Sequence, residues 1–339
     1  MILRSPVIQR ASQDRPYQLI TAITMLHTRT CEFVSPMHPD KLCDFISDSV
    51  VDAYLAQDPK SRVAVETLGG HGVITLSGEV TSTGKVDLKA LVQKIVGPRF
   101  EVHLHSTQQS PEIARGVDDG GAGDQGIMVG YATAETSTHM PLPYETARRL
   151  CRDIFKKYPY DGKVQVTTRG SEIATVVASF QHAKQNELLP LVKSLVEAEE
   201  YFVNPAGDWD LGGFDADSGL TGRKIVVDAY GPDVPVGGGA FSGKDYTKVD
   251  RSGAYMARRI AVDYLKKYRA QEVLVKLAFA IGKKDPVMAT AIVDGVKHPI
   301  SGYDLTPRGI KELLKLDRPI YAETSTWGHF GNNFVWDGV

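Results

Sequence analysis

The order of predicted elements along this 339-residue chain repeats three times, and this repeat constrains the fold more than any other feature. Each pass contains an amphipathic helix, a β-rich run, a turn, a second β-rich run and a second helix. The first helices of the three passes begin roughly 100 residues apart, which is close to the size of a typical domain. The pattern predicts leading helices at 40–57, 144–157 and 249–267, paired strands at 62–67 with 73–81, 163–168 with 173–181 and 273–281 with 287–293, and closing helices near 86–96, 186–199 and 306–316.

A further short apolar run precedes each leading helix, at 28–34, 127–133 and 224–230, and we interpret these runs as strands. A sheet that carries helices on one face must still bury its other face, so we expect three such faces to pack against one another. The chain is therefore predicted to have an α/β fold of the α+β type, built from three similar sheet-and-helix units. We expect a loose N-terminal extension over 1–25, an N-terminal unit over 26–112, a central unit over 113–212 and a C-terminal unit over 213–339.

The overall charge argues against some classes of partner. Lys and Arg number 39 against 41 Asp and Glu, a formal charge of −2, which lacks the basic excess of nucleic-acid or membrane-surface proteins. The sequence contains no run of about 18 apolar residues, so we predict no transmembrane helix. Three cysteines without a CxxC pair make a disulfide framework or a thiolate zinc site improbable, and we expect a reducing, cytoplasmic location.

Two glycine-rich stretches match known phosphate-binding patterns incompletely. Residues 121–126 fit G-x-G-x-x-G, but a strand follows the stretch instead of preceding it, so a glycine-rich turn is favoured over a dinucleotide site. Residues 238–244 fit G-x-x-x-x-G-K, but Asp245 stands where a P-loop needs Ser or Thr. A P-loop ATPase stays open as an alternative enzyme, and a plain surface loop as the simplest interpretation. Exposed backbone N–H groups beside an ammonium still indicate a phosphate ligand.

Basic residues gather around the second glycine-rich stretch. Arg223, Lys224, Lys244 and Lys248 flank glycines and an apolar run, whereas isolated lysines usually lie on a solvated surface. This clustering favours a polyanion pocket in a protein that is nearly neutral overall.

The start of the first leading helix has the residues of an anion or metal site. His38, Asp40 and Lys41 fall at a helix N-terminus, where the helix dipole favours anions and a carboxylate can hold a metal that bridges phosphates. Asp44, Asp48 and Asp52 continue at intervals of four residues, and we interpret these three as a solvated stripe. The isolated His71, His182 and His329 are interpreted as structural histidines.

Several long motifs, in the same order, resemble one known family. From about Thr28 to its end, the chain resembles the S-adenosylmethionine synthetase (methionine adenosyltransferase) family. The resemblance rests on HPDK at 38–41 with ISD at 46–48, GAGDQG at 121–126, GLTGRK at 219–224, GGGAFSGKD at 237–245, KVDRS at 248–252, and YAET with GHFG at 321–324 and 328–331.

The resemblance implies a pseudo-threefold fold, homodimers or tetramers with active sites between subunits, and a reaction of ATP with L-methionine. The methionine sulfur would attack ribose C5′ and expel triphosphate, which is then hydrolysed to pyrophosphate and phosphate. Two Mg²⁺ ions and one K⁺ ion are the implied cofactors. The implied catalytic residues are His38, Lys163, Arg223 and Lys244; the nucleotide contacts also include Asp161, Asp208, Trp209, Asp217, Lys224 and Ala240; the methionine contacts are Glu79, Gln109, Asp124, Asp217 and Lys248; and the metal ligands are Asp40 and Asp250 for Mg²⁺ and Glu66 for K⁺.

The chain also departs from the family pattern. Met37 stands where Gly is usual, Asp208-Trp209 replaces an Arg-Phe pair, and the segment from Ser110 to Gly120 is shorter than the usual mobile gating loop. Two alternatives to the enzyme therefore stay open: a non-catalytic homologue that binds ATP or methionine, and a regulatory subunit.

Overall fold

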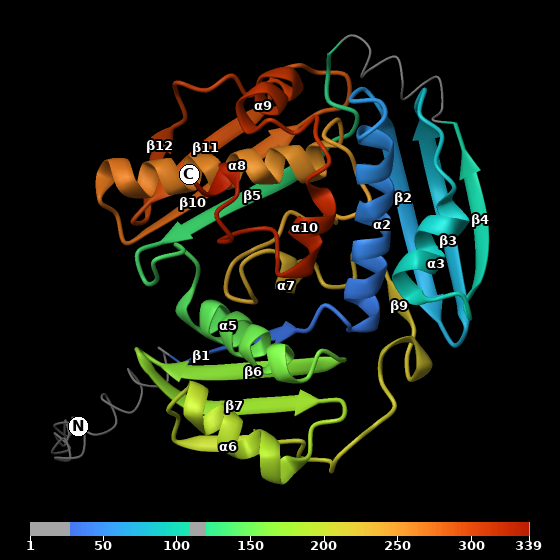
Figure 1. Ribbon diagram of the computed structural model, residues 1–339. Helices are drawn as coiled ribbons and strands as arrows, with labels where there is room; N and C mark the ends of the chain where they lie inside the picture. The colour runs from blue at the N-terminus through green and yellow to red at the C-terminus, as the bar shows by residue number, and fades with distance from the viewer. Residues whose placement is uncertain (1–27, 109–119, 339) are drawn as a thin grey trace, which may run out of the picture.

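The computed structural model describes residues 28–108 and 120–338, which contain three four-stranded sheets and the helices that cover them (Figure 1). The sheet orders are β9-β2-β3-β4, β1-β6-β7-β8 and β5-β10-β11-β12. The strands are β1 (Thr28–Val34), β2 (Arg62–Gly70), β3 (Val73–Thr81), β4 (Glu101–Thr107), β5 (Gly126–Thr133), β6 (Gly162–Arg169), β7 (Glu172–Phe180), β8 (Glu200–Val203), β9 (Gly219–Leu220), β10 (Glu272–Phe279), β11 (Met288–Val293) and β12 (Val296–Pro299).

Long helices lead each unit, as the sequence predicted, and shorter ones follow. The helices are α2 (Pro39–Leu55), α3 (Leu88–Val96), α5 (Leu142–Lys157), α6 (Gln185–Leu195), α7 (Ile225–Asp228), α8 (Val249–Tyr268), α9 (Pro307–Leu314) and α10 (Tyr321–Thr326), with single 3₁₀ turns at Gly213–Asp215 and Val335–Asp337. No helix in these described ranges combines the length and the apolar character needed to cross a membrane.

The strand before each leading helix pairs with a hairpin of a different unit. β1 lies antiparallel to β6 of the central unit, β5 lies antiparallel to β10 of the C-terminal unit, and β9 pairs with β2 of the N-terminal unit. Each sheet is therefore assembled from two stretches of chain far apart in sequence. This cyclic exchange ties the three units together through backbone hydrogen bonds.

The expectation for the sheet faces was wrong. On β2, Val63, Val65 and Thr67 are buried on the face that α2 covers, while Glu66 and Leu68 are exposed on the other face. β6, β7 and β10 show the same alternation of buried and partly exposed residues, whereas β5 is buried on both faces from Met128 to Thr133. The partly exposed faces of the three sheets do not pack against one another within the described residues. In Figure 1, α2 lies toward the centre of the molecule beside α10, and its sheet lies outside it.

The apolar run at 224–230 was also interpreted wrongly. It forms the short helix α7, and the strand that precedes it, β9, spans only two residues. A short apolar run has no periodicity that separates a buried strand from a buried helical turn. Here Thr221 and Gly222 turn the chain immediately after β9, and Asp228 at the end of α7 is held by the buried ammonium of Lys41.

The edge strands β4, β8 and β12 and the helix α10 were not predicted, and the helix expected to reach Glu199 ends at Leu195. β12 follows a tight turn at Asp294-Gly295, where both residues have positive φ, the signature of a type I′ hairpin. An Asp-Gly dipeptide was therefore the overlooked signal for this strand.

The carboxylates of α2 are not a solvated stripe, and this is the main correction to the sequence interpretation. Asp44 and Asp48 are buried, and Asp52 is half-buried. Asp44 accepts from the Gly222 N–H at 2.8 Å, and Asp48 accepts from the Gly243 N–H at 2.8 Å. Asp52 accepts from the first N–H groups of α10, those of Tyr321 at 2.8 Å and Ala322 at 2.9 Å. The row is thus a set of anchors for the C-terminal unit.

Asp48 also forms a bidentate ion pair with Arg251 of α8, at 2.6 and 2.8 Å, and both side chains are fully buried. We predict that Asp48→Ala lowers the free energy of unfolding by about 3–5 kcal/mol, because the guanidinium would stay buried without its counter-charge. Denaturant unfolding measures the change. The matched control is Arg169→Ala, which removes an exposed pair with Glu199 and should cost at most about 1 kcal/mol. A loss at Asp48 no larger than the control would contradict the anchoring role.

Candidate active site

The N-terminus of α2 holds His38 and Asp40 in fixed positions. His38 is the N-cap residue in extended conformation, Pro39 occupies the first helical turn, and the His38 Nδ1 accepts from the Asp40 N–H at 3.2 Å. The Asp40 carboxylate accepts from the Leu220 N–H at 3.0 Å and from the Lys224 ammonium at 2.5 Å. Although burial alone would raise it, these two hydrogen bonds lower the pKa of Asp40 below its usual value.

Cations converge on this helix end. Arg223 Nε lies 3.5 Å from Asp40 Oδ1, and burial together with the charges of Lys224 and Lys163 lowers the pKa of His38 to about 4. The His38 imidazole is therefore neutral at pH 7. Since its Nδ1 accepts a backbone N–H, the ring proton lies on Nε2, which is free to donate.

Two further residues of the predicted site come from the start of the central hairpin: Lys163 in β6, and Asp161 immediately before β6. The Lys163 ammonium lies 2.5 Å from Glu32 on the neighbouring strand β1. Asp161 accepts from the Gly213 N–H at 3.0 Å, and burial raises its pKa. We call this set the α2 cluster; it contains His38, Asp40, Asp161, Lys163, Asp217, Arg223 and Lys224.

Asp217 belongs to the α2 cluster because its negative charge raises the pKa of both His38 and Asp161. Its side chain is exposed. A hollow of about 450 Å³ beside the cluster is lined by Glu32, Gln165, Arg223 and Lys224, together with apolar residues of α7. Two cations that line an open hollow, Arg223 and Lys224, suit a polyanion with several phosphoryl groups.

A second set of predicted residues gathers at the start of α8. The Lys244 ammonium contacts Asp250 at 2.7 Å, and Lys248 forms an ion pair with the buried Asp245. The backbone of Lys244 forms an isolated antiparallel β-bridge with Ala64 of β2. On its other side, Ala64 pairs with Glu79 of β3. Lys244 and Glu79 therefore flank Ala64 on the open face of this sheet.

Glu66 and Asp124 lie at the margin of this second set. Glu66 is exposed on β2 two residues after Ala64, and hence on the same open face. Asp124 receives the Gln125 N–H at 2.7 Å just before β5, whose first residue, Gly126, approaches Asp250. We call this set the α8 cluster; it contains Glu66, Glu79, Asp124, Lys244, Lys248 and Asp250.

The glycine-rich stretch at 237–243 is shaped by contact with the α8 cluster and not by a P-loop. A Cβ on Gly239 would lie 2.3 Å from the Asp250 carboxylate, and one on Gly243 would lie 2.1 Å from the Val65 carbonyl oxygen. The stretch lies between α7 and α8 without the strand–loop–helix order of a P-loop. The G-x-G-x-x-G stretch leads into β5, as the sequence context indicated.

The structure separates the predicted residues into two groups. In the described ranges, no hydrogen bond or ion pair joins a member of the α2 cluster directly to a member of the α8 cluster. The backbones of the two regions do approach each other, since a Cβ on Gly222 would lie 2.5 Å from the Cβ of Ala240.

Four predicted residues belong to neither cluster, and the first of them is Ala240, which lies beside Gly222. Asp208 accepts from the Gln185 N–H at 2.8 Å at the start of α6, which is a helix-terminal role. Trp209 is half-buried beside Gly212. Gln109, with most of the short segment that follows it, lies outside the described residues.

The carboxylates of Asp40 and Asp250 suit the kind of Mg²⁺ site in which the ion is also bound by phosphate oxygens. In the described ranges, no three His, Cys, Asp or Glu side chains are grouped as ligands for one ion. Asp40 and Asp250 are instead single carboxylates, each already beside a lysine ammonium. Mg²⁺ in phosphate sites characteristically takes one or two carboxylates and completes its shell with water and phosphate oxygens. These residues fit that donor set.

Sequence reasoning missed Glu32, Asp228 and Asp245, which each hold a lysine in place. It also missed the positioning role of Asp44 and Asp48. The available signal was their four-residue spacing from Asp40, which puts them on the same helix face as the residue already assigned to the site.

The fold is that of a mixed α/β protein, and it carries two clusters of basic and carboxylate side chains. The chain matches three family models, described as the N-terminal domain (residues 26–103), the central domain (119–209) and the C-terminal domain (211–338) of S-adenosylmethionine synthetase. The chain therefore belongs to the S-adenosylmethionine synthetase family.

Curated relatives agree with this assignment over nearly the whole chain. An S-adenosylmethionine synthase of Pelagibacter ubique is 42% identical, with 91% of this chain and 95% of the relative covered. S-adenosylmethionine synthase 2 of Rhodospirillum rubrum is 41% identical over 91% of this chain and 93% of its own length. The synthase of Thermus thermophilus is 41% identical over 91% of this chain and 95% of its own length.

The close approach at Gly239 gives a test of the α8 cluster. We predict that Gly239→Ala pushes the Asp250 carboxylate away from Lys244 and weakens binding of Mg²⁺–tripolyphosphate by about 10²-fold, since a displacement of about 1 Å can have an effect of that size. Isothermal titration calorimetry measures the affinity. Gly170→Ala is the control: nothing lies within 4 Å of the added methyl group, and the strain at its positive φ falls in the β6–β7 turn, outside the α8 cluster. Equal affinities for the two variants would show that Asp250 takes no part in the site.

Proposed function

We propose that this chain synthesises S-adenosylmethionine from ATP and L-methionine. The observation that carries the proposal is the α2 cluster: a neutral His38 at a helix N-terminus, with Lys163, Arg223 and Lys224 around the Asp40 carboxylate. The methionine sulfur attacks ribose C5′, and the C5′–O bond breaks to release triphosphate. The same site then hydrolyses the bound triphosphate to pyrophosphate and phosphate.

The chain's own residues stabilise charge and position groups, and none needs to act as a nucleophile. The Nε2–H of His38 donates toward the oxygen that leaves C5′, while the cations of the α2 cluster bind the phosphoryl oxygens. Bound Mg²⁺ supplies further neutralisation of the triphosphate charge, with Asp40 and Asp250 as its protein ligands. Preorganised donors of this kind act on the charge that develops in the transition state.

The methionine and monovalent-cation residues are proposed on the α8 cluster. Lys248 binds the methionine carboxylate, and Glu79 and Asp124 contact the amino acid, together with Gln109 and Asp217. Glu66 holds K⁺ through its exposed carboxylate on the open face of β2. Ala240 and Trp209 line the nucleotide.

The active form is proposed to be a homodimer with active sites at the subunit interface. Two such homodimers can also associate into a tetramer. Two observations support this: the open sheet faces carry Lys163 and Glu66, and the α2 and α8 clusters are not joined directly within one chain. A site completed across the interface would bring the α2 cluster of one subunit to the α8 cluster of the partner. The three sheet-and-helix units, over 26–112, 113–212 and 213–339, are proposed to be related by a pseudo-threefold axis.

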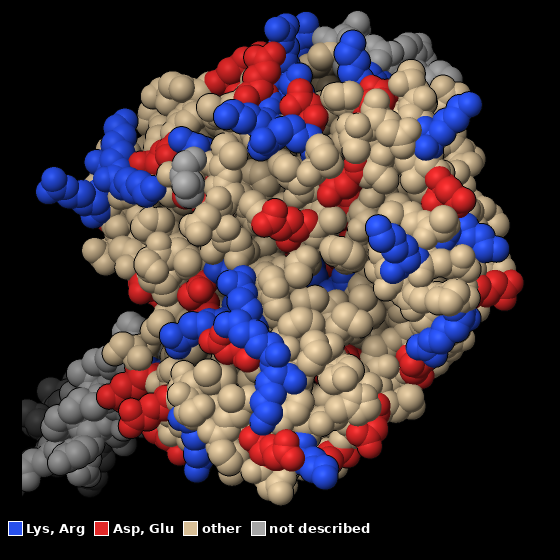
Figure 2. Space-filling model, viewed as in Figure 1, with Lys and Arg blue, Asp and Glu red and all other residues tan. Residues whose placement is uncertain are grey.

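The proposal also covers location and partners. The three cysteines are buried and free, which supports a reducing, cytoplasmic location. Lys and Arg side chains alternate with Asp and Glu over the face drawn in Figure 2, which supports small-molecule substrates and not nucleic acid as the partner.

Product formation tests the function. Purified protein with ATP, methionine, Mg²⁺ and K⁺ should yield S-adenosylmethionine by mass spectrometry, together with pyrophosphate and phosphate. Binding of ATP and methionine without product would instead identify the non-catalytic homologue. Binding of neither would leave only a regulatory subunit.

Metal dependence gives a prediction for Asp40 and Asp250. Two carboxylates beside a triphosphate need cations, because like charges at short range repel strongly. We predict that Asp40→Asn and Asp250→Asn each abolish synthesis with little change in melting temperature, since Asn retains an oxygen for the Leu220 N–H. Chelation with EDTA should abolish synthesis as well. Full activity in EDTA would rule out the metal role.

Subunit mixing tests whether the two clusters meet across an interface. Lys224→Ala and Lys244→Ala should each lower kcat by about 10²–10³-fold. Co-expressed, they form heterodimers that carry one intact site and one doubly substituted site, so the mixture should regain about a quarter of wild-type activity. The control mixes Lys224→Ala with Arg223→Ala, which belong to the same cluster and should show no recovery. Equal recovery in both mixtures, or in neither, would exclude a shared site.

A further inference from the structure

A second hollow, separate from both clusters, lies where the three units meet. It has a volume of about 310 Å³, at the lower end of the range for small-molecule sites. Lys60 and Arg62 line it from the turn before β2 and from the start of β2, and Tyr246 and Thr247 line it from the loop before α8. The remaining lining residues are Gly120, Gly121, Pro307, Arg308 and Lys311.

The described part of the lining is basic wherever it carries charge. Lys60, Arg62, Arg308 and Lys311 line the hollow, and no Asp or Glu among the described residues does. Acidic neighbours lie behind two of these cations: Glu312 is 2.8 Å from Arg308 Nε, and Asp317 is 3.5 Å from Lys311 Nζ. Lys60 forms no ion pair with any other described residue. Among the described residues, Lys60 therefore adds a positive charge without a counter-charge to this lining, in a protein whose net charge is −2.

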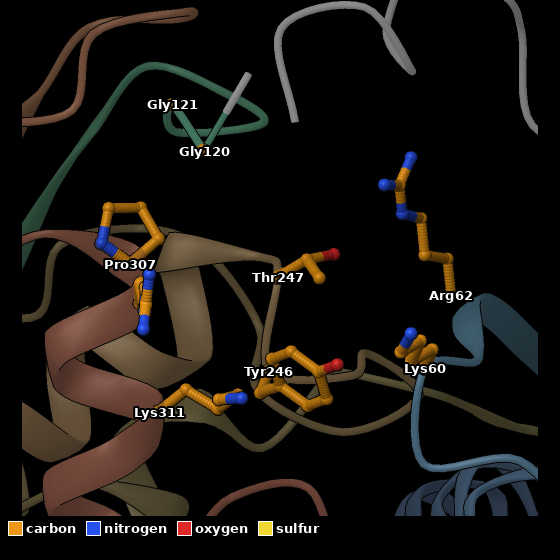
Figure 3. Close-up of a pocket in the computed structure, with 9 residues that line it drawn as sticks. Lys60, Arg62, Gly120, Gly121, Tyr246, Thr247, Pro307 and Lys311 are labelled. Atoms are coloured by element: carbon orange, nitrogen blue, oxygen red, sulfur yellow. The ribbon is translucent and has the colours of Figure 1, made fainter. Parts of the chain in front are cut away.

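Polar groups on its floor are directed inward. Figure 3 shows the Thr247 hydroxyl and the Arg62 guanidinium extending into the same space, with the Lys60 ammonium below them. The Thr247 Oγ1 is buried and has no hydrogen-bond partner among the described residues. Buried hydroxyls in native proteins nearly always have a partner, so this hydroxyl is available to pair with an oxyanion.

Tyr246 closes the other side of the floor. Its hydroxyl donates to the Pro59 carbonyl oxygen at 3.0 Å, and Lys311 Nζ lies 5.9 Å from its ring centroid. Burial raises the pKa of Tyr246 to about 12, so this wall of the hollow adds no negative charge at pH 7. An oxyanion would meet ammonium, guanidinium and hydroxyl donors together.

We propose that this hollow is a second anion site that binds a small oligophosphate, outside the site of the proposed reaction. Phosphoryl oxygens suit the fork of Arg62 and the point charges of Lys60 and Lys311, and a single P–O group can accept from Thr247. The same chemistry is present in free pyrophosphate and in the phosphate chain of a nucleotide. The inference does not depend on the proposed reaction, because no residue of the α2 or α8 cluster lines the hollow.

Isothermal titration calorimetry with inorganic pyrophosphate tests the proposal, on the full chain without Mg²⁺ at low salt. The wild type should show two classes of site. Lys60→Ala/Lys311→Ala should weaken one class by at least about tenfold, because each charge-assisted contact contributes at least that factor. Thr247→Val, which keeps the shape and removes the hydroxyl, should weaken the same class. Lys224→Ala should weaken only the other class.

The matched control is Lys89→Ala/Lys297→Ala, which removes the same charge from exposed positions elsewhere. A wild type with one class of site, or a second class that survives Lys60→Ala/Lys311→Ala or is lost equally in the control, would overturn the proposal. A parallel titration with ATP distinguishes the sources: binding of both ligands shows that a terminal phosphate chain is sufficient, and binding of pyrophosphate alone shows selection of the free anion. Formation of S-adenosylmethionine is scored separately, so failure of the proposed reaction and failure of this site are distinguishable.

Discussion

The row of carboxylates on α2 is the interaction on which the rest of the structure depends. Asp40, Asp44, Asp48 and Asp52 stand one turn apart on one helix face. They accept hydrogen bonds from three segments of the C-terminal unit, namely residues 220–224, Gly243 and the start of α10. A helix of the N-terminal unit is thereby bound to residues about 180 to 270 positions further along the chain. The buried carboxylates lose much of their hydration, so each must keep its hydrogen-bond partner. This requirement fixes the position of α2 relative to the C-terminal unit.

The same row sets the geometry of both clusters. Asp40 fixes Lys224 directly, and Asp44 holds the Gly222 N–H immediately before Arg223. Asp48 holds the Gly243 N–H immediately before Lys244, and its partner Arg251 donates to the Lys244 carbonyl oxygen. One rigid helix therefore positions the cations of two clusters that share no direct contact. Stabilisation of charge in a transition state requires cations in fixed positions, because displacements of about 1 Å can remove much of a catalytic effect.

The exchange of strands ties together the three sheet-and-helix units that the sequence pattern predicted. β1, β5 and β9 each complete a sheet whose hairpin belongs to another unit. The exchange is reinforced by close packing, since a Cβ on Gly130 of β5 would lie 2.0 Å from the backbone of Ala257 in α8. Unfolding one unit would thus leave an unpaired strand edge in another. The open outer faces of the sheets are the surfaces left for contacts outside the chain.

The sequence by itself determined the leading helices, the paired strands that follow them and the glycine-rich turns, because local periodicity and turn residues specify these elements over short distances. It also indicated His38, Asp40, Arg223, Lys224 and Lys244 as site residues, since their motifs are contiguous. Only the tertiary structure decided that Asp44, Asp48 and Asp52 are anchors, because burial depends on partners far along the chain. The same holds for α7, for the edge strands and for the separation of Lys224 from Lys244 into two clusters. These features arise from long-range pairing, which no local pattern encodes.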